Sequence, residues 1–135
     1  MNLKICAAGI FLAYCSIAVN ATEIYYNKIT GLRGLLTERQ GFECCTDGKE
    51  KRVNFPVIEL RSPINVLPIN SSKPETDEII EIGVMSMQLV MDEEAWKIYK
   101  KLKGKSARVL CLPYHAINGH HMTSVLCEVK SIEDK

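Results

Sequence analysis

Three histidines and two adjacent cysteines are the side chains of this sequence best suited to bind a metal ion. His115, His120 and His121 lie close together near the C-terminal end, whereas Cys44 and Cys45 lie far upstream. Imidazole and thiolate groups are the usual protein ligands of Zn²⁺ and copper. A fold that brings these residues together would form a transition-metal site, although their spacing matches no structural zinc motif. The alternative is that the histidines make local contacts within a turn.

The same residues define a second possible chemistry, that of a thiol enzyme. A reduced Cys44 or Cys45 beside one of the histidines would be a nucleophile next to its base. However, the sequence has no Ser-His-Asp order, phosphate-binding loop or His-Glu metalloprotease helix. We therefore expect a binding protein without catalytic activity.

The histidines lie in the polar turn of a predicted β-hairpin that spans residues 108–130. Apolar, β-favouring residues occupy 109–114 and 123–129, and the Asn-Gly pair between them tolerates positive φ. Side chains at such a tip are available to a partner. The residues predicted to bind a ligand are His115, Asn118, His120 and His121.

Two further cysteines lie within the same hairpin. A register that places Cys111 opposite Cys127 also places Val109 opposite Val129, so each of these pairs is apolar. Opposed Cα atoms at a non-hydrogen-bonded site are roughly 4.5 Å apart, close to the lower edge of disulfide geometry. We predict a Cys111–Cys127 disulfide in this register, with two buried free thiols as the alternative.

The N-terminal residues 1–21 have the pattern of a signal peptide. Lys4 precedes an apolar run that ends at Val19, and a Val-Asn-Ala sequence suits a signal peptidase. The run is shorter than the ~20 residues of a spanning helix, so we expect no membrane span in the mature chain. An alternative lipoprotein site ends at Cys15, but Tyr14 is bulky for the position before it. We expect an exported protein, periplasmic or secreted.

Residues 22–135 then form one domain that carries no net charge. The chain has 17 basic and 16 acidic residues, and they balance once Lys4 is removed with the signal peptide. Nucleic-acid binding requires a basic excess to replace released counterions, so we exclude this class. Four cysteines remain in an exported domain, and disulfides are the default there.

The order of predicted elements indicates a mainly β fold with one helix. Residues 92–103 have an acidic start, a basic end and one apolar face, all typical of a helix. In the strand at 53–66, Pro56 predicts a bulge. In the strand at 78–91, a change of face near Gly83 is expected, and methionines 85, 87 and 91 would fill the interior rather than bind copper. The predicted strands are 28–39, 53–66, 78–91, 109–114 and 123–129.

A helix between the third and fourth of five strands is typical of the OB-like Greek-key barrel, with the order β-β-β-α-β-β. A split β-sandwich is the alternative. In OB-type barrels, the loops after the first and fourth strands flank the usual binding face. Here these loops hold Cys44 and Cys45 on one side and the three histidines on the other.

Residues 87–132 resemble a family of small exported bacterial domains of unknown function. The match rests on Gly104-Lys105, Leu112, His115, the Gly-His-His sequence at 119–121, Thr123 and Val125-Leu126. Met122 stands where the family tends to have a third histidine, which weakens a metal site there. Cysteines at 111 and 127 replace small and apolar residues of the family pattern. The resemblance implies a type of domain but no reaction.

We therefore expect an exported, periplasmic binding module that recognises a protein or cell-envelope ligand. The two loops and the second and third strands would form its binding face, and one concrete form is an inhibitor or immunity protein. No cofactor is needed for this role. The alternatives are a Zn- or Cu-binding protein that uses the histidines with Cys44 and Cys45, and a thiol enzyme.

Overall fold

The computed structural model describes residues 21–43, 48–70 and 78–134. These residues form six strands and one helix. In chain order they are β1 (Thr22–Tyr25), β2 (Thr30–Glu43), β3 (Lys51–Leu67), β4 (Glu81–Val90), α1 (Glu93–Leu102), β5 (Ser106–His115) and β6 (Val125–Asp134). The mainly β class with a helix between the third and fourth long strands is confirmed. Apart from Ala21, the predicted signal peptide lies outside the described residues.

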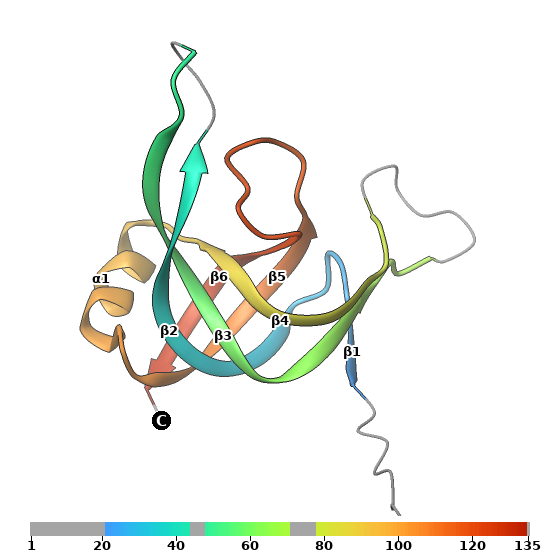
Figure 1. Ribbon diagram of the computed structural model, residues 1–135. Coiled ribbons are helices and arrows are strands. Elements are labelled where there is room, and N and C mark those ends of the chain that lie inside the picture. Colours follow the sequence, from blue (N-terminus) through green and yellow to red (C-terminus); the bar gives the residue numbers. More distant parts are fainter. Residues whose placement is uncertain (1–20, 44–47, 71–77, 135) are drawn as a thin grey trace, which may run out of the picture.

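The five long strands close into an OB-like Greek-key barrel (Figure 1). β2 pairs antiparallel with both β3 and β5, β3 pairs antiparallel with β4, and β5 pairs antiparallel with β6. A parallel pairing of β4 with β6 closes the ring, so the split-sandwich alternative is wrong. β1 is an additional short strand that pairs parallel with the end of β3. Four residues give too short a pattern to reveal β1 in the sequence.

Side chains on the inner faces of the strands form the hydrophobic core. Leu36, Ile58 and Met87 are cross-strand neighbours on β2, β3 and β4, and all three are fully buried. The predicted methionine stripe is only partly correct, because Met85 is 45% exposed. The change of face on β4 is confirmed, since Val84 is buried on one phase and Met87 and Leu89 on the other.

The bulge predicted at Pro56 lies elsewhere on β3. β2 and β3 pair without interruption from Gly34 and Leu60 to their shared hairpin. The irregularity lies on the other edge of β3, where pairing with β4 shifts between Glu59 and Ile64. Proline lacks an N–H group, but Pro56 is beyond the part of β3 that pairs with β4, so no bulge is needed.

Helix α1 begins and ends where the sequence predicts. The Asp92 side chain caps it by accepting the Ala95 N–H at 2.8 Å, and Gly104 follows its end with φ of 85°. Glycine adopts a positive φ without strain, which explains the stop. The hydroxyl of the buried Tyr99 donates to the Thr37 carbonyl at 2.7 Å and joins the helix to β2.

The β5–β6 hairpin contains the predicted Cys111–Cys127 disulfide, with the two Cα atoms 5.1 Å apart. The predicted register is wrong by two residues, since Cys111 lies opposite Val129 and Cys127 lies opposite Pro113. A shift of two residues keeps each side chain on its original face, so the sulfur atoms still meet, but diagonally. The turn sets this register, because the Ala116 N–H donates to the Ser124 carbonyl and closes a long loop.

Candidate functional site

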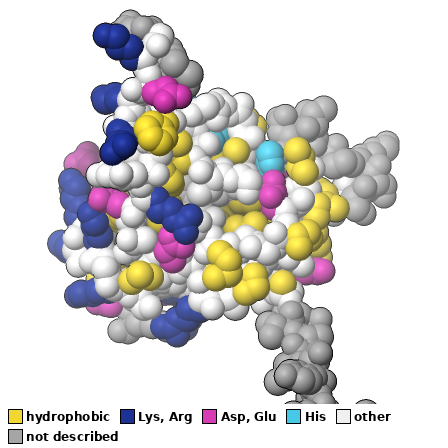
Figure 2. Space-filling view, viewed as in Figure 1, with side chains coloured by type: hydrophobic (Ala, Val, Ile, Leu, Met, Phe, Trp, Pro, Cys, Tyr) yellow, Lys and Arg dark blue, Asp and Glu magenta, His cyan; other side chains and the backbone are white. Residues whose placement is uncertain are grey.

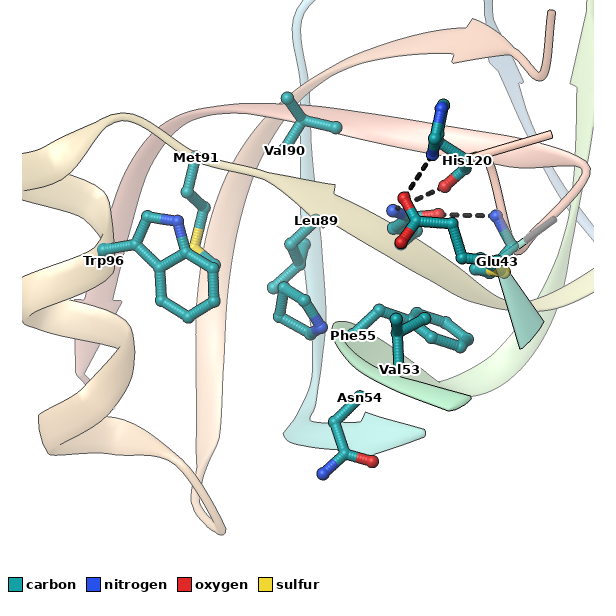
Figure 3. Close-up of a pocket in the computed structure, with 12 residues that line it drawn as sticks. Glu43, Val53, Asn54, Phe55, Leu89, Val90, Met91, Trp96 and His120 are labelled. Carbon is teal, nitrogen blue, oxygen red and sulfur yellow. Dashed lines mark hydrogen bonds and ion pairs between the residues drawn. The ribbon is translucent and has the colours of Figure 1, made fainter. Parts of the chain in front are cut away.

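An open cleft of about 440 Å³ lies on the barrel surface where β3 and β4 separate. The two strands pair from Val57 and Gln88 onward. Before Val57, β3 follows β2 into its hairpin, while β4 continues past Gln88 towards α1. The cleft opens between them and is lined by Glu43, residues 53–56 and 88–91, Trp96, His120 and Met122 (Figure 3).

Main-chain groups on both strands point into this cleft. The Gln88 N–H donates to the Thr123 hydroxyl at 2.9 Å, so it points away from β3. Because main-chain groups alternate in direction along a strand, those of Leu89 and Met91 point towards β3. The same alternation directs the N–H and C=O of Asn54 towards β4. The cleft therefore offers two facing strand edges that are not paired with each other.

The two ends of the cleft differ in chemistry. At the helix end, Trp96 and Met91 are partly buried and present apolar surface (Figure 3). At the opposite end, the His120 ring nitrogen Nδ1 contacts the Glu43 carboxylate (Figure 3). Phe55 lies between these ends and is only 8% exposed. A ligand would thus meet an apolar end, an aromatic floor and a polar end.

The β5–β6 loop, residues 116–124, forms one wall of the cleft and is fastened to β4. The Gln88 side chain accepts the Met122 N–H at 2.6 Å and donates to the His120 carbonyl at 3.4 Å. The Thr123 hydroxyl in turn donates to the Val125 carbonyl at 2.7 Å. Met122 packs into the space above Gly41, where an added Cβ would lie 2.9 Å from the Met122 sulfur. The missing side chain of Gly41 therefore lets the loop approach β2.

The three histidines face different neighbours. His115 Nε2 lies 3.1 Å from Glu81 Oε1, on the side of the barrel that also holds Tyr26. His121 Nδ1 accepts the Ile117 N–H at 3.0 Å, and its ring packs edge-on against the Tyr114 ring. Burial lowers the pKa of His121 below its ordinary value of 6.5, and the nearby His120 lowers it further. Of the three, only His120 lines the cleft.

The fold thus separates His115 from His120, because these two predicted site residues contact different carboxylates. Asn118 accepts the His120 N–H through its side chain at 2.9 Å, which is a turn contact. Among the residues that the structure describes, no three His, Cys, Asp or Glu side chains gather to hold a metal ion. Cys44 and Cys45, on which the thiol-enzyme hypothesis also depends, lie outside the described residues.

Sequence reasoning missed most of the cleft. Trp96 lies within the predicted helix, and Glu43 lies outside all of the predicted strands. The residues that line the cleft come from separate parts of the chain, so no local pattern in the sequence marks them. In the described part of the cleft lining no serine, threonine, lysine or cysteine occurs, so it offers no hydroxyl, amine or thiol nucleophile.

The outer surface is unevenly charged although the formal charge is close to zero. Figure 2 shows lysine and arginine side chains gathered on the side that carries α1 and the β2–β3 hairpin. Exposed hydrophobic side chains gather on the opposite side in the same view. No described helix is long and apolar enough to cross a membrane.

The fold and cleft define an OB-type barrel with an open surface cleft. Residues 86–133 match the family model "Domain of unknown function (DUF4431)", which spans the end of β4, α1, β5 and nearly all of β6. The expected resemblance of this segment to a family of domains of unknown function is confirmed. Neither the curated proteins nor the solved structures include a match to the chain.

Proposed function

We propose that the protein is an exported, periplasmic binding module that holds a segment of a partner protein in the β3–β4 cleft. The observation that carries this proposal is the cleft itself, which has an aromatic floor, a polar end and two facing strand edges. Extended polypeptide segments satisfy such edges through main-chain hydrogen bonds and place alternate side chains in pockets. An inhibitor or immunity protein is one role that fits this mode of binding.

The composition of the cleft also favours a protein ligand. Trp96, Met91 and Met122 supply adaptable or aromatic surface, which is typical of protein-binding sites. Glu43 and His120 add polar groups that could fix the orientation of a partner. The cleft lies between β3 and β4, the second and third strands of the barrel, and beside the β5–β6 loop, which follows the fourth. OB-type barrels usually bind their ligands on this face.

Photo-cross-linking in living cells tests this proposal. A photoreactive amino acid replaces Asn54, which is exposed in the cleft, or Lys101, which is exposed on α1 away from it. We expect one discrete cross-linked protein from position 54 and none from position 101, and a several-fold lower yield when His120→Ala is added. Equal yields from both positions, or no product from position 54, would contradict the proposal.

A metal-binding role is a second candidate for a specific reason. Cys44 directly follows Glu43 in the chain, and Glu43 contacts His120. A histidine, a carboxylate and a thiolate are all donors that zinc accepts. Elemental analysis of the protein purified without an affinity tag tests this role. One bound Zn or Cu that is lost in Cys44→Ser/Cys45→Ser would support it, and a metal content well below one would exclude it.

A further inference from the structure

Three arginines lie side by side across three strands on the outer surface of the barrel, further along β3 than the cleft. Arg33 on β2 is directly opposite Arg108 on β5. Arg61 on β3 lines the same surface hollow as Arg33. We refer to Arg33, Arg61 and Arg108 as the arginine row.

Like charges that are directly opposed on neighbouring strands destabilise a sheet. The surrounding acidic side chains relieve this repulsion only in part. Arg108 pairs with Glu133 at 3.2 Å, and Arg61 donates to the neutral Ser106 hydroxyl at 3.2 Å. Arg33 forms no ion pair with any residue that the structure describes, and Glu59, the one acidic residue of β3, pairs with Arg39. The row therefore keeps an excess of positive charge.

The hollow beside the row has the composition of an anion site. It has a volume of about 320 Å³, and its floor is formed by the buried side chains of Leu32, Leu60 and Ile64. Arg33 and Arg61 line it together with the hydroxyl-bearing Thr22 and Ser62. All of its polar side chains can donate hydrogen bonds, and none is acidic.

Gly31 lets the third arginine reach the same surface. An added Cβ at Gly31 would lie 3.0 Å from Arg108 Nη2, so the guanidinium group lies across the bare backbone of β2. Gly31 also lines the hollow. The absence of a side chain at this position thus lets the charge of Arg108 reach the edge of the hollow.

We propose that the arginine row binds an oxyanion group of the phosphate or sulfate type. Arg33 and Arg61 would bind it through their guanidinium forks, whose planar donors match the spacing of phosphate oxygens. Arg108 would add charge, and the Ser62 and Thr22 hydroxyls would donate to the remaining oxygens. This site is separate from the β3–β4 cleft and does not depend on the function proposed for it.

Thermal unfolding and NMR titration with inorganic phosphate test the site, with sodium chloride at matched ionic strength as the reference. We expect phosphate to raise the Tm and to shift the backbone amide signals of β2 and β3 next to the hollow. Arg33→Gln should weaken phosphate binding about tenfold, because one charge-assisted fork is lost. The same variant should unfold at a higher temperature than the wild type when phosphate is absent, because the repulsion is relieved.

Two controls make the result decisive. Lys101→Gln removes a positive charge from the outer face of α1 and should leave phosphate binding unchanged. Binding to vesicles of phosphatidylglycerol, compared with vesicles of phosphatidylcholine, distinguishes a lipid-borne phosphate from a free one. If vesicle binding depends on Arg33 and inorganic phosphate has no effect, the oxyanion is a lipid headgroup. No binding to either probe, or equal binding by wild type and Arg33→Gln, would overturn the proposal.

Discussion

The β5–β6 hairpin has two parts that are held in place by different forces. We call its paired strands the base and its loop the tip. At the base, Cys111 and Cys127 are fully buried and joined by a disulfide within the apolar core. At the tip, the loop of residues 116–124 is held by hydrogen bonds from Gln88 and by the contact of His120 with Glu43. Many buried atoms and a covalent bond fix the base, whereas a few polar contacts fix the tip. Changes at the base should therefore alter stability, and changes at the tip should alter binding.

Removal of the disulfide should have the largest effect on stability. The cysteines are 16 residues apart. A disulfide that closes a loop of this length stabilises a protein by about 3 kcal/mol, mainly by restricting the unfolded chain. We expect Cys111→Ala/Cys127→Ala to lower the free energy of unfolding in urea by about this amount.

The tip should be insensitive to that change. The amide signals of residues 116–124 should keep their positions in NMR spectra of the folded double variant, and cross-linking from position 54 should persist. If the loop rearranges although the barrel stays folded, base and tip are coupled and the comparison fails.

Two glycines on β2 allow the packing of the barrel to be compared with that of the tip. A Cβ at Gly34 would lie 2.2 Å from the Glu59 carbonyl oxygen, so the backbone of β3 would have to move. A Cβ at Gly41 would instead meet the flexible end of Met122 at 2.9 Å and the Phe55 ring at 3.0 Å.

We expect Gly34→Ala to lower the free energy of unfolding by about 2 to 3 kcal/mol, and Gly41→Ala by less than about 1 kcal/mol. Urea denaturation of the two variants measures both values. Gly41→Ala should also displace the Met122 methyl signal in NMR spectra. Equal losses of stability would show that the tip is packed as rigidly as the barrel.

The Gln88 side chain is the main attachment of the tip, and its removal should have a smaller effect on stability. Gln88→Ala leaves the Met122 N–H without its acceptor, which should cost about 1 kcal/mol. The same loss should speed amide exchange at Met122 about fivefold while exchange in β5 and β6 stays slow. Gln88→Glu is the matched control, because it keeps the acceptor and loses only the donor to His120. Unchanged exchange in Gln88→Ala would show that other contacts hold the loop.

The difference between base and tip also explains how much of the structure could be predicted from the sequence. Helix α1 followed from its capping residues and its apolar face, and most of the five long strands followed from apolar, β-favouring runs. The disulfide followed because both cysteines share a face of one hairpin. These features depend on local patterns or on neighbours in the sequence.

The register and the sites depend on features that no local pattern contains. The predicted register of β5 and β6 differs from the observed register by two residues. The reason is that the loop closes at Ala116 and Ser124, outside the Asn-Gly pair of the predicted turn. The cleft exists because β3 and β4 separate beyond Val57, and its walls come from distant parts of the chain. Arg33 and Arg108 meet only through the pairing of β2 with β5. Composition could exclude a globally basic protein, but it could not reveal a local row of arginines.

His121 should give the smallest effect and the finest test of the tip. Burial and the proximity of His120 lower its pKa below 6.5, so the unfolded chain binds a proton at a pH where the folded protein does not. Stability should therefore fall as the pH decreases through about 6.5 towards the pKa of the folded state, and His121→Gln should lessen this fall. The measurements are Tm values at about pH 7.5 and about pH 5.5, together with NMR titration of the ring protons. If His121 titrates at or above 6.5, its ring is solvated, and the tip is then even less firmly attached than the base.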